Sequence, residues 1–188
     1  MDFEKLTNKS KELVQDVVSL AAREKHQFIA PEHLLSVMLN AKDNGTVTEL
    51  LQKSGANVEN LRNAVDAALK RLPQVSGESV QSSMSQEFTR VMMEAEKLAE
   101  QAGDSYVTVE RILQALAQTA GTKAYEAMKS AGVNPVALNQ AVNEMRKGRI
   151  ADSESAEDNF NALKKYAIDI TARAKEGKLD PVIGREHE

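Results

Sequence analysis

The sequence predicts an all-α domain made of two copies of a four-helix repeat, about eight helices, followed by a flexible linker and a short C-terminal helix. Three observations lead to this prediction. The stretch FIAPEHLL, which begins at Phe28, returns as YVTVERIL at Tyr106, 78 positions later. Helix caps and breakers recur at nearly the same offset. Hydrophobic residues make up 41% of the 188 residues, with only four Pro and nine Gly. This balance is typical of a helical globular protein, and the two copies are expected to pack with pseudo-twofold symmetry.

The composition argues against several classes of function. A formal net charge of -4 and the lack of a basic face with interleaved aromatics do not favour nucleic-acid binding. The sequence has no cysteine, which rules out a disulfide framework or a thiol nucleophile. No stretch approaches the roughly 18 apolar residues of a membrane span, and the charged N-terminal stretch does not resemble a signal peptide. We therefore expect a cytoplasmic protein with no membrane partner.

Each copy is predicted to begin with a long amphipathic helix. Thr7 is a candidate N-cap in the first copy, and Ser85 occupies the equivalent position in the second. Both caps are followed by apolar residues at helical spacing with polar residues between them. These apolar residues are Leu13, Val14, Val17, Leu20 and Ala21 in the first copy, and Val91, Met92, Ala95, Leu98 and Ala99 in the second.

Three further helices in each copy are predicted from proline, glycine and polar caps. Proline suits a first helical position, glycine follows helix ends, and asparagine caps helix starts. A third, short helix is expected to follow one glycine and stop at the next. The markers in the first and second copies are Pro31 and Thr108 for the second helix, Gly45 to Gly55 and Gly121 to Gly132 for the third, and Asn57 and Asn134 for the fourth.

Two polar stretches divide the chain into predicted domains. Residues 71–85 contain Pro, Gly and five serines and are interpreted as a connector between the copies. Residues 147–159 (KGRIADSESAEDN) lack apolar periodicity and are interpreted as an exposed linker. The predicted domain therefore spans residues 1–147, with repeats at about 6–72 and 84–147, a linker at 148–159 and an incomplete module at 160–188. Within this module, apolar residues from Phe160 to Ala174 share one helical face, and the helix is expected to end at Gly177.

These residues resemble those of a known family. The double four-helix repeat with EHLL in its first copy is similar to the Clp N-terminal domain. LKKYAIDITARAKEGKLDPVIGRE, residues 163–186, resembles the entry into the first AAA+ ATPase module of the same proteins. KLTNK near the start, RLPQV after the first repeat and LKKYAIDIT near the end are similar to ClpB-type disaggregases rather than to the protease-linked ClpA and ClpC types.

The resemblance implies a substrate-recognition domain of an ATP-dependent chaperone. It would capture unfolded or aggregated polypeptide and pass it to a hexameric AAA+ ring that cooperates with the DnaK system. The alternative is a domain that docks a folded adaptor, as in protease-linked relatives. The chain has no GxxxxGK[ST] loop, so we expect no enzyme activity and no cofactor in this fragment, which should be monomeric. In the longer protein ATP and Mg would bind, with Val182 and Ile183 near the adenine.

Six residues are candidates for substrate contact, on the basis of the resemblance. The polar members align with positions near the substrate-binding groove of ClpB-like N-domains. Relatives often carry an apolar residue immediately after the glutamate of this set, whereas this chain carries an arginine, so a less apolar groove is expected. The candidates are Thr7, Met92, Leu98, Asp104, Glu110 and Arg111.

These candidates also have purely structural interpretations. Thr7 is suited to a helix cap, Asp104 to a turn, and Glu110 to the N-terminus of a helix. Met92 and Leu98 fall on the periodic face of the fifth helix, where an apolar residue is more often part of the core. The sequence alone therefore leaves both interpretations open for each residue.

No metal or catalytic centre is expected. His26 and His33 lie seven residues apart, and Pro31 interrupts any helix that would align them. Without cysteine or a His-x-x-x-His spacing, metal binding is not favoured, and His33 is expected to be a packing or helix-surface residue. The serines between positions 76 and 85 lack a Gly-x-Ser-x-Gly elbow and are interpreted as turn formers.

Overall fold

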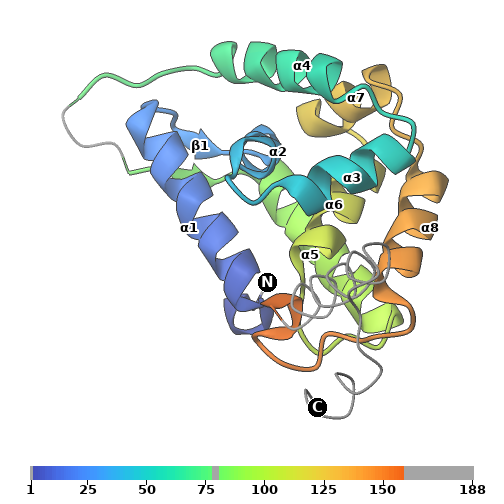
Figure 1. Cartoon of the computed structure of the whole chain (residues 1–188). Helices are drawn as coiled ribbons and strands as arrows, with labels where there is room; N and C mark the ends of the chain where they lie inside the picture. The colour runs from blue at the N-terminus through green and yellow to red at the C-terminus, as the bar shows by residue number, and fades with distance from the viewer. Residues whose placement is uncertain (1, 78–80, 159–188) are drawn as a thin grey trace, which may run out of the picture.

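The computed structural model describes residues 2–77 and 81–158, and in these residues the duplicated helical fold is confirmed (Figure 1). The first copy contains α1 (Asn8–Arg23), α2 (Pro31–Asn40), α3 (Gly45–Lys53) and α4 (Val58–Lys70). The second contains α5 (Gln86–Gln101), α6 (Val109–Gln118), α7 (Lys123–Ser130) and α8 (Pro135–Arg146). A 3-10 helix, η1 (Phe3–Lys5), precedes α1, and the two-residue strands β1 (Phe28–Ile29) and β2 (Ser83–Met84) precede α2 and α5. The predicted C-terminal helix, the predicted module at 160–188 and the Val182–Ile183 pair lie outside the described residues.

The predicted caps form at most helix starts. The Ser85 hydroxyl accepts from the Phe88 N–H at 3.0 Å at the start of α5. Asn57 and Asn134 cap α4 and α8 in the same way. Thr108 precedes α6, as predicted, but its side chain accepts no hydrogen bond from that helix. Local sequence chemistry therefore defines these helix starts, and α6 is the exception.

The second helix of each copy lies at the centre of the bundle. In α6, eight consecutive residues from Glu110 to Ala117 are buried, and α2 is buried on nearly all sides. Figure 1 shows these two helices surrounded by the other six. A helix buried all round is expected to be apolar, so the polar residues within α6 require partners inside the protein.

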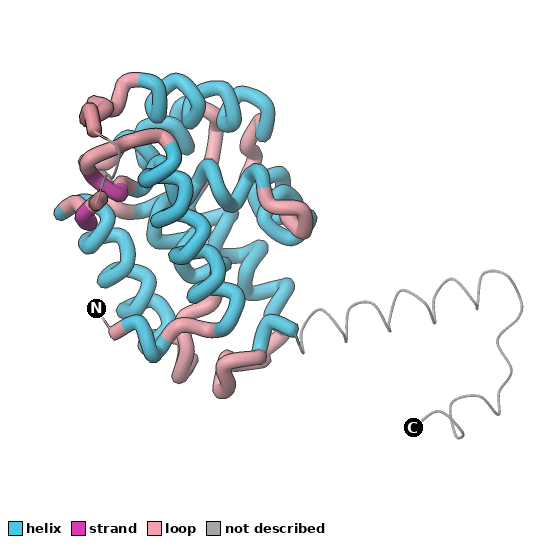
Figure 2. The backbone as a smooth tube through the Cα atoms, turned by 90° about the vertical axis from the view of Figure 1, so that its left-hand side faces the viewer, coloured by secondary structure: helices cyan, strands magenta, loops and turns pink. Residues whose placement is uncertain are grey.

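Short segments that precede helices in one copy pair with equivalent segments of the other copy. Leu6 pairs with Val107, and Ile29 pairs with Met84, both in parallel. Leu6 and Met84 are 78 positions apart, as are Ile29 and Val107, so a single pairing occurs twice with the copies interchanged. Figure 2 shows β1 and β2 side by side at one edge of the helical body. The start of each copy is thereby fixed to the other copy.

A second pair of equivalent contacts joins the copies at the starts of α4 and α8. The Asn57 N–H donates to the Ala131 carbonyl at 2.9 Å, and the Asn134 N–H donates to the Ser54 carbonyl at 3.1 Å. Both asparagines also cap their helices, so the same residues start the fourth helices and join the copies. This is the pseudo-twofold relation that the repeated sequence predicts.

The chain turns back after α8. Lys147 and Gly148 both have positive φ, at 50° and 82°. The ten residues that follow, 149–158, are named the return segment. Figure 1 shows it in orange to red, ending beside the start of α1. The expectation of a fully exposed linker was wrong here, because Ala151, Ala156 and Glu157 are buried. The proposed domain boundary at residue 147 stays a prediction.

Candidate functional site

Four charged side chains form a buried ion-pair cluster at the start of α6. Arg111 Nε lies 2.9 Å from Asp104 Oδ2, and Arg146 Nη1 lies 3.0 Å from Asp104 Oδ1. Arg146 Nε lies 2.7 Å from Glu110 Oε1. All four side chains are at most 7% exposed. We name Asp104, Glu110, Arg111 and Arg146 the ion-pair cluster.

Three elements bring this cluster together. Asp104 follows the end of α5, Glu110 and Arg111 lie in the first turn of α6, and Arg146 is the last residue of α8. An acidic residue at a helix N-terminus and a basic residue at a C-terminus each interact favourably with the helix dipole. Arg149 completes the end of α8 by donating from Nη2 to the Met145 carbonyl at 2.7 Å.

Burial and pairing act in opposite directions on this cluster. Burial alone would raise the pKa of Asp104, but hydrogen bonds from Arg146, the Ala151 N–H and Arg111 hold that pKa below its usual range. Burial likewise opposes the charge of Arg146, while Asp104 and Glu110 raise its pKa. Two carboxylates therefore balance two guanidinium groups, and the ionised cluster has no net charge.

A further carboxyl group, that of Glu157, lies against this cluster. Glu157 Oε1 contacts the Thr7 hydroxyl, and its Oε2 accepts from the Val109 N–H at 3.1 Å. Glu157 therefore accepts a hydrogen bond from a main-chain N–H in the first turn of α6, where the Thr108 side chain does not act as a cap. The hydroxyl of Thr108 accepts instead from Arg146 Nη2 at 3.0 Å. Burial, reinforced by the charge of Glu110, raises the pKa of Glu157 to about 7.

Protonation of the Glu157 carboxyl would supply the hydrogen that one of the side-chain contacts around it otherwise lacks. Thr7 Oγ1 lies within hydrogen-bonding reach of Glu157 Oε1 and of Ser10 Oγ, but a hydroxyl has one hydrogen to donate. Ser10 Oγ already donates to the Val107 carbonyl at 2.8 Å. If Glu157 carries a proton, it donates to Thr7, Thr7 donates to Ser10, and Ser10 donates to Val107. The neutral carboxyl also leaves the charge balance of the cluster intact.

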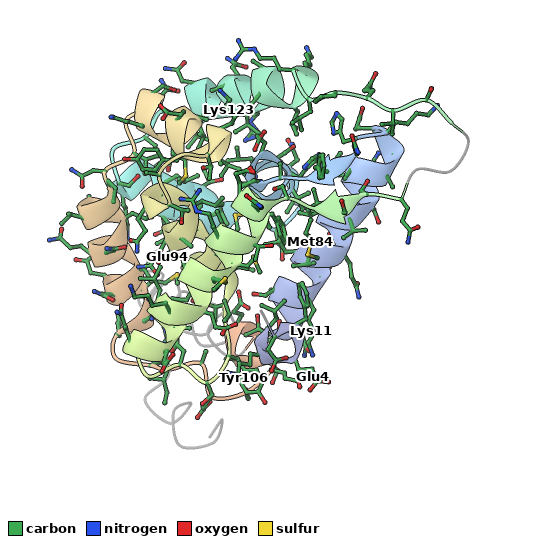
Figure 3. All side chains as sticks on the ribbon, turned by 180° about the vertical axis from the view of Figure 1, so that it is seen from behind. Glu4, Lys11, Met84, Glu94, Tyr106 and Lys123 are labelled. Carbon is green, nitrogen blue, oxygen red and sulfur yellow. The ribbon has the colours of Figure 1, made fainter. Side chains whose placement is uncertain are left out.

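The main chain of the return segment makes hydrogen bonds at Ala151 and Glu154, before Glu157. The Ser105 and Tyr106 N–H groups donate to the Ala151 carbonyl at 2.8 and 3.1 Å. The Ala151 N–H donates to Asp104 Oδ1 at 2.9 Å. The Asn8 N–H donates to the Glu154 carbonyl at 2.8 Å. Figure 3 shows Tyr106 at the same end of the molecule as Glu4 and Lys11, which flank the start of α1.

The structure gathers four of the six predicted site residues and places two elsewhere. Thr7 and Asp104 contact the return segment, and Arg111 and Glu110 belong to the ion-pair cluster beside it. Met92 is 1% exposed within the core, and Leu98 is partly buried against that core. The burial of Met92 agrees with its structural interpretation. Substrate contact by these residues stays a prediction.

Two residues of this site were missed from the sequence. Arg146 follows Leu138 and Val142 at intervals of four, so it continues the apolar face of α8. A charged residue on a core face indicates a buried partner, and this signal was present in the sequence. Glu157 lies in an acidic, low-hydrophobicity stretch with no such pattern. No local signal identified it.

His26 and His33 occupy the positions in the first copy that Asp104 and Arg111 occupy in the second, 78 residues later. His26 Nδ1 lies 2.9 Å from His33 Nε2, and both rings are buried. Burial, reinforced by His26, lowers the pKa of His33 to about 4. The Ala30 N–H donates to His33 Nδ1 at 2.9 Å, so this histidine orders the start of α2. The two histidines share no helix, as Pro31 predicts, because α2 begins at that proline, but the segment between them brings their rings into contact.

Within the described ranges, no helix is both long and apolar enough to cross a membrane. The same residues contain no group of three or more His, Cys, Asp or Glu side chains placed to hold a metal ion.

The comparisons with known proteins define the family and the fold of this chain. Residues 5–131 match the Clp repeat (R) N-terminal domain, and the chain belongs to this family. It is 46% identical over 188 residues to the chaperone protein ClpB of Brucella suis biovar 1 (strain 1330), covering all of this chain and 21% of that relative. ClpB of Mesorhizobium japonicum is 45% identical over 188 residues, with 22% of its length covered. The chain is therefore the N-domain of a Clp-family chaperone, and it spans about a fifth of the length of these relatives.

Solved structures show the same fold. The N-terminal domain of Hsp104 from Candida albicans matches with a TM-score of 0.70 at 20% identity, covering 81% of this chain and 98% of that one. The N-domain of ClpV from Vibrio cholerae matches with a TM-score of 0.62 at 18% identity, covering 79% and 87%. The expectation of a Clp N-domain is confirmed.

Proposed function

We propose that this domain captures unfolded or aggregated polypeptide and passes it to the AAA+ ring of a longer chaperone. One observation carries the proposal: the surface formed by Thr7, the 104–109 loop and the ion-pair cluster holds a peptide segment through main-chain hydrogen bonds. Those bonds do not depend on the sequence of the bound segment, which is the property that a receptor for varied unfolded chains requires. A solved complex of the ClpV N-domain with a VipB peptide, 21% identical with a TM-score of 0.57, gives support from the same fold.

The candidate residues have distinct roles in this proposal. Thr7 supplies a hydroxyl at the start of α1, and Asp104 orients the loop amides that meet a bound main chain. Glu110 and Arg111 hold Asp104 and Arg146 in place. Leu98 adds partly exposed apolar surface, whereas Met92 lies in the core and supports the surface from below. The mechanism is reversible capture, without bond chemistry.

The longer protein supplies the remaining steps of the proposal. ATP and Mg would bind in AAA+ modules, where Val182 and Ile183 would lie near the adenine, and a hexameric ring would act with the DnaK system in the cytoplasm. The matched family is the Clp repeat (R) N-terminal domain and not an ATPase module, so we propose no ATP hydrolysis by this piece, which would be monomeric. Adaptor docking is not favoured, because the relatives are ClpB chaperones.

Photo-crosslinking tests where an unfolded chain binds. Benzoylphenylalanine replaces Tyr106 in the 104–109 loop or, as a matched control, the equally half-buried Tyr125 of α7. We expect the protein substituted at Tyr106 to crosslink reduced, unfolded casein, and an excess of unlabelled casein to suppress the product. The protein substituted at Tyr125 should give little product. Equal yields from both positions, or a product only from the Tyr125 position, would contradict the proposed site.

A further inference from the structure

The return segment occupies the candidate site without a large buried apolar side chain of its own. Its buried apolar residues are Ala151 and Ala156, while the side chain of Ile150 remains 46% exposed. The remaining contacts are main-chain hydrogen bonds and the bonds of Glu157. Any extended peptide with small residues at the two alanine positions could form the same main-chain bonds. Since the buried apolar area governs most of the holding free energy, the segment is weakly held for its length.

The Glu157 position selects for an uncharged hydrogen-bonding group. Its surroundings include Glu110 and Asp158 as acids and Lys9 as a base, beside an ion-pair cluster that is already balanced. An amide in place of the carboxyl would accept from the Val109 N–H and donate to the Thr7 hydroxyl. It would thus form the hydrogen bonds of a protonated glutamate at every pH.

We infer that this surface is a receptor for an extended peptide segment in which a small residue is followed, six positions later, by an amide or neutral carboxyl side chain, and that the return segment fills it in cis. The small residue corresponds to Ala151, whose carbonyl accepts from two loop amides, and the side chain corresponds to Glu157. Capture of an outside polypeptide then requires release of the return segment. This last consequence rests on the proposed function, whereas the receptor itself does not.

The test uses the whole 188-residue chain, labelled with ¹⁵N. Glu157→Lys should release the return segment, and Glu157→Gln should retain it. Glu154→Lys is the matched control, because it makes the same charge change on the same segment at a half-exposed side chain. Where the lysine variant does not fold, Glu157→Ala removes the same hydrogen bonds without adding a charge.

The probes are synthetic peptides with the sequence of residues 149–158, RIADSESAED, and with glutamine at the position of Glu157, together with a scrambled peptide. In Glu157→Lys we expect at least tenfold faster amide exchange at Ser105, Tyr106 and Val109 than in the parent chain. Both native-order peptides should shift these amides, the glutamine peptide at lower concentration. The parent chain, the Glu157→Gln chain and the Glu154→Lys chain should require at least threefold more peptide for the same shifts.

Two results would overturn the inference. Unchanged protection in both Glu157→Lys and Glu157→Ala would make the return segment a fixed part of the repeat, comparable to Gln74, which forms an isolated antiparallel bridge with His26 in the first copy. Faster exchange without peptide-induced shifts would show that no receptor remains once the segment leaves.

Unfolded casein separates this inference from the proposed function. We expect at least threefold tighter binding to Glu157→Lys than to the parent chain, with shifts at the same amides. Equal affinities would overturn occupation of the substrate site in cis. Binding to neither protein would end the proposed function, and the peptide result would still decide whether the receptor exists.

Discussion

At the scale of residues, Arg146 connects more of the candidate site than any other described side chain considered above. Its guanidinium bonds to Asp104, Glu110 and Thr108 from the last residue of α8. Its removal would leave two buried carboxylates with insufficient positive charge. Breaking a buried ion pair by deleting one partner is far more destabilising than losing an exposed pair.

We therefore expect Arg146→Met to lower the free energy of unfolding by about 3–5 kcal/mol, measured by urea denaturation. Arg23→Met is the control, since Arg23 lies in the last turn of α1 and is exposed. The control should change stability by no more than about 0.5 kcal/mol. Similar small effects in both variants would show that the cluster contributes little to the fold.

The pH dependence of stability reports the protonation of Glu157. Its pKa is about 7 in the folded chain, above the ordinary 4.5, so the folded state holds a proton that the unfolded state has lost between these pH values. The stability that Glu157 contributes is therefore fully present below pH 4.5 and is lost as the pH rises through 7. His33, with a pKa lowered to about 4, acts in the opposite direction between pH 4 and 6.5.

Comparison with Glu157→Gln cancels the His33 contribution, because both proteins contain the histidine pair. We expect the two proteins to have similar free energies of unfolding at pH 5, and the glutamine variant to be more stable by about 1–3 kcal/mol at pH 8. Chemical denaturation at several pH values provides the measurement. A constant difference from pH 5 to 8 would be inconsistent with a neutral Glu157.

At the scale of elements, the sequence predicted what local chemistry determines. Ser85, Asn57 and Asn134 cap the helices assigned to them, because a cap needs only its own next turn. Thr108 does not, since Arg146, distant in sequence, takes its hydroxyl and Glu157 supplies the missing acceptor. Tertiary contacts decided this helix start.

The candidate site was partly predictable for the same reason. Four of the six residues lie near the starts of α1 and α6, and their contact with substrate stays a prediction. The return segment has no apolar periodicity, and its small alanines and polar residues were interpreted as an exposed linker. The return segment is held by main-chain hydrogen bonds and by one carboxyl group. Neither kind of contact produces a recognisable pattern in the sequence. Met92 is buried in the core, as its position on the periodic apolar face indicated.

The junction between α3 and α4 in one copy and α7 and α8 in the other depends on close approach of the backbone. Gly132 has φ of +92°, and an added Cβ would lie 3.1 Å from the Gly55 carbonyl oxygen. We expect Gly132→Ala to destabilise the protein by more than about 1 kcal/mol. Gly45→Ala is the control, because Gly45 begins α3 and its added Cβ would meet nothing within 4 Å.

Thermal and urea unfolding of the two alanine variants provide the comparison. The control should be neutral or more stable by about 0.4–1 kcal/mol, since alanine reduces the freedom of the unfolded chain. Equal effects at both positions would mean that the contact between the copies is not tight.

At the scale of the whole molecule, the two copies share one fold but carry different polar side chains at equivalent positions. The copies exchange equivalent segments at Leu6–Val107 and Ile29–Met84, and a single core extends through both. At equivalent positions, one copy carries the contacting histidines His26 and His33, and the other carries the charged cluster. The proposed capture site therefore belongs to the second copy and to the start of the first.

The position of the proposed capture site is tested most directly by an NMR titration of the ¹⁵N-labelled chain with reduced, unfolded casein. We expect weak, saturable shifts centred on Thr7, Asp104, Tyr106 and Val109, accompanied by faster exchange in the return segment. The amides of the His26–His33 loop should remain unchanged. Shifts confined to that loop, or no shifts at saturating casein, would contradict it.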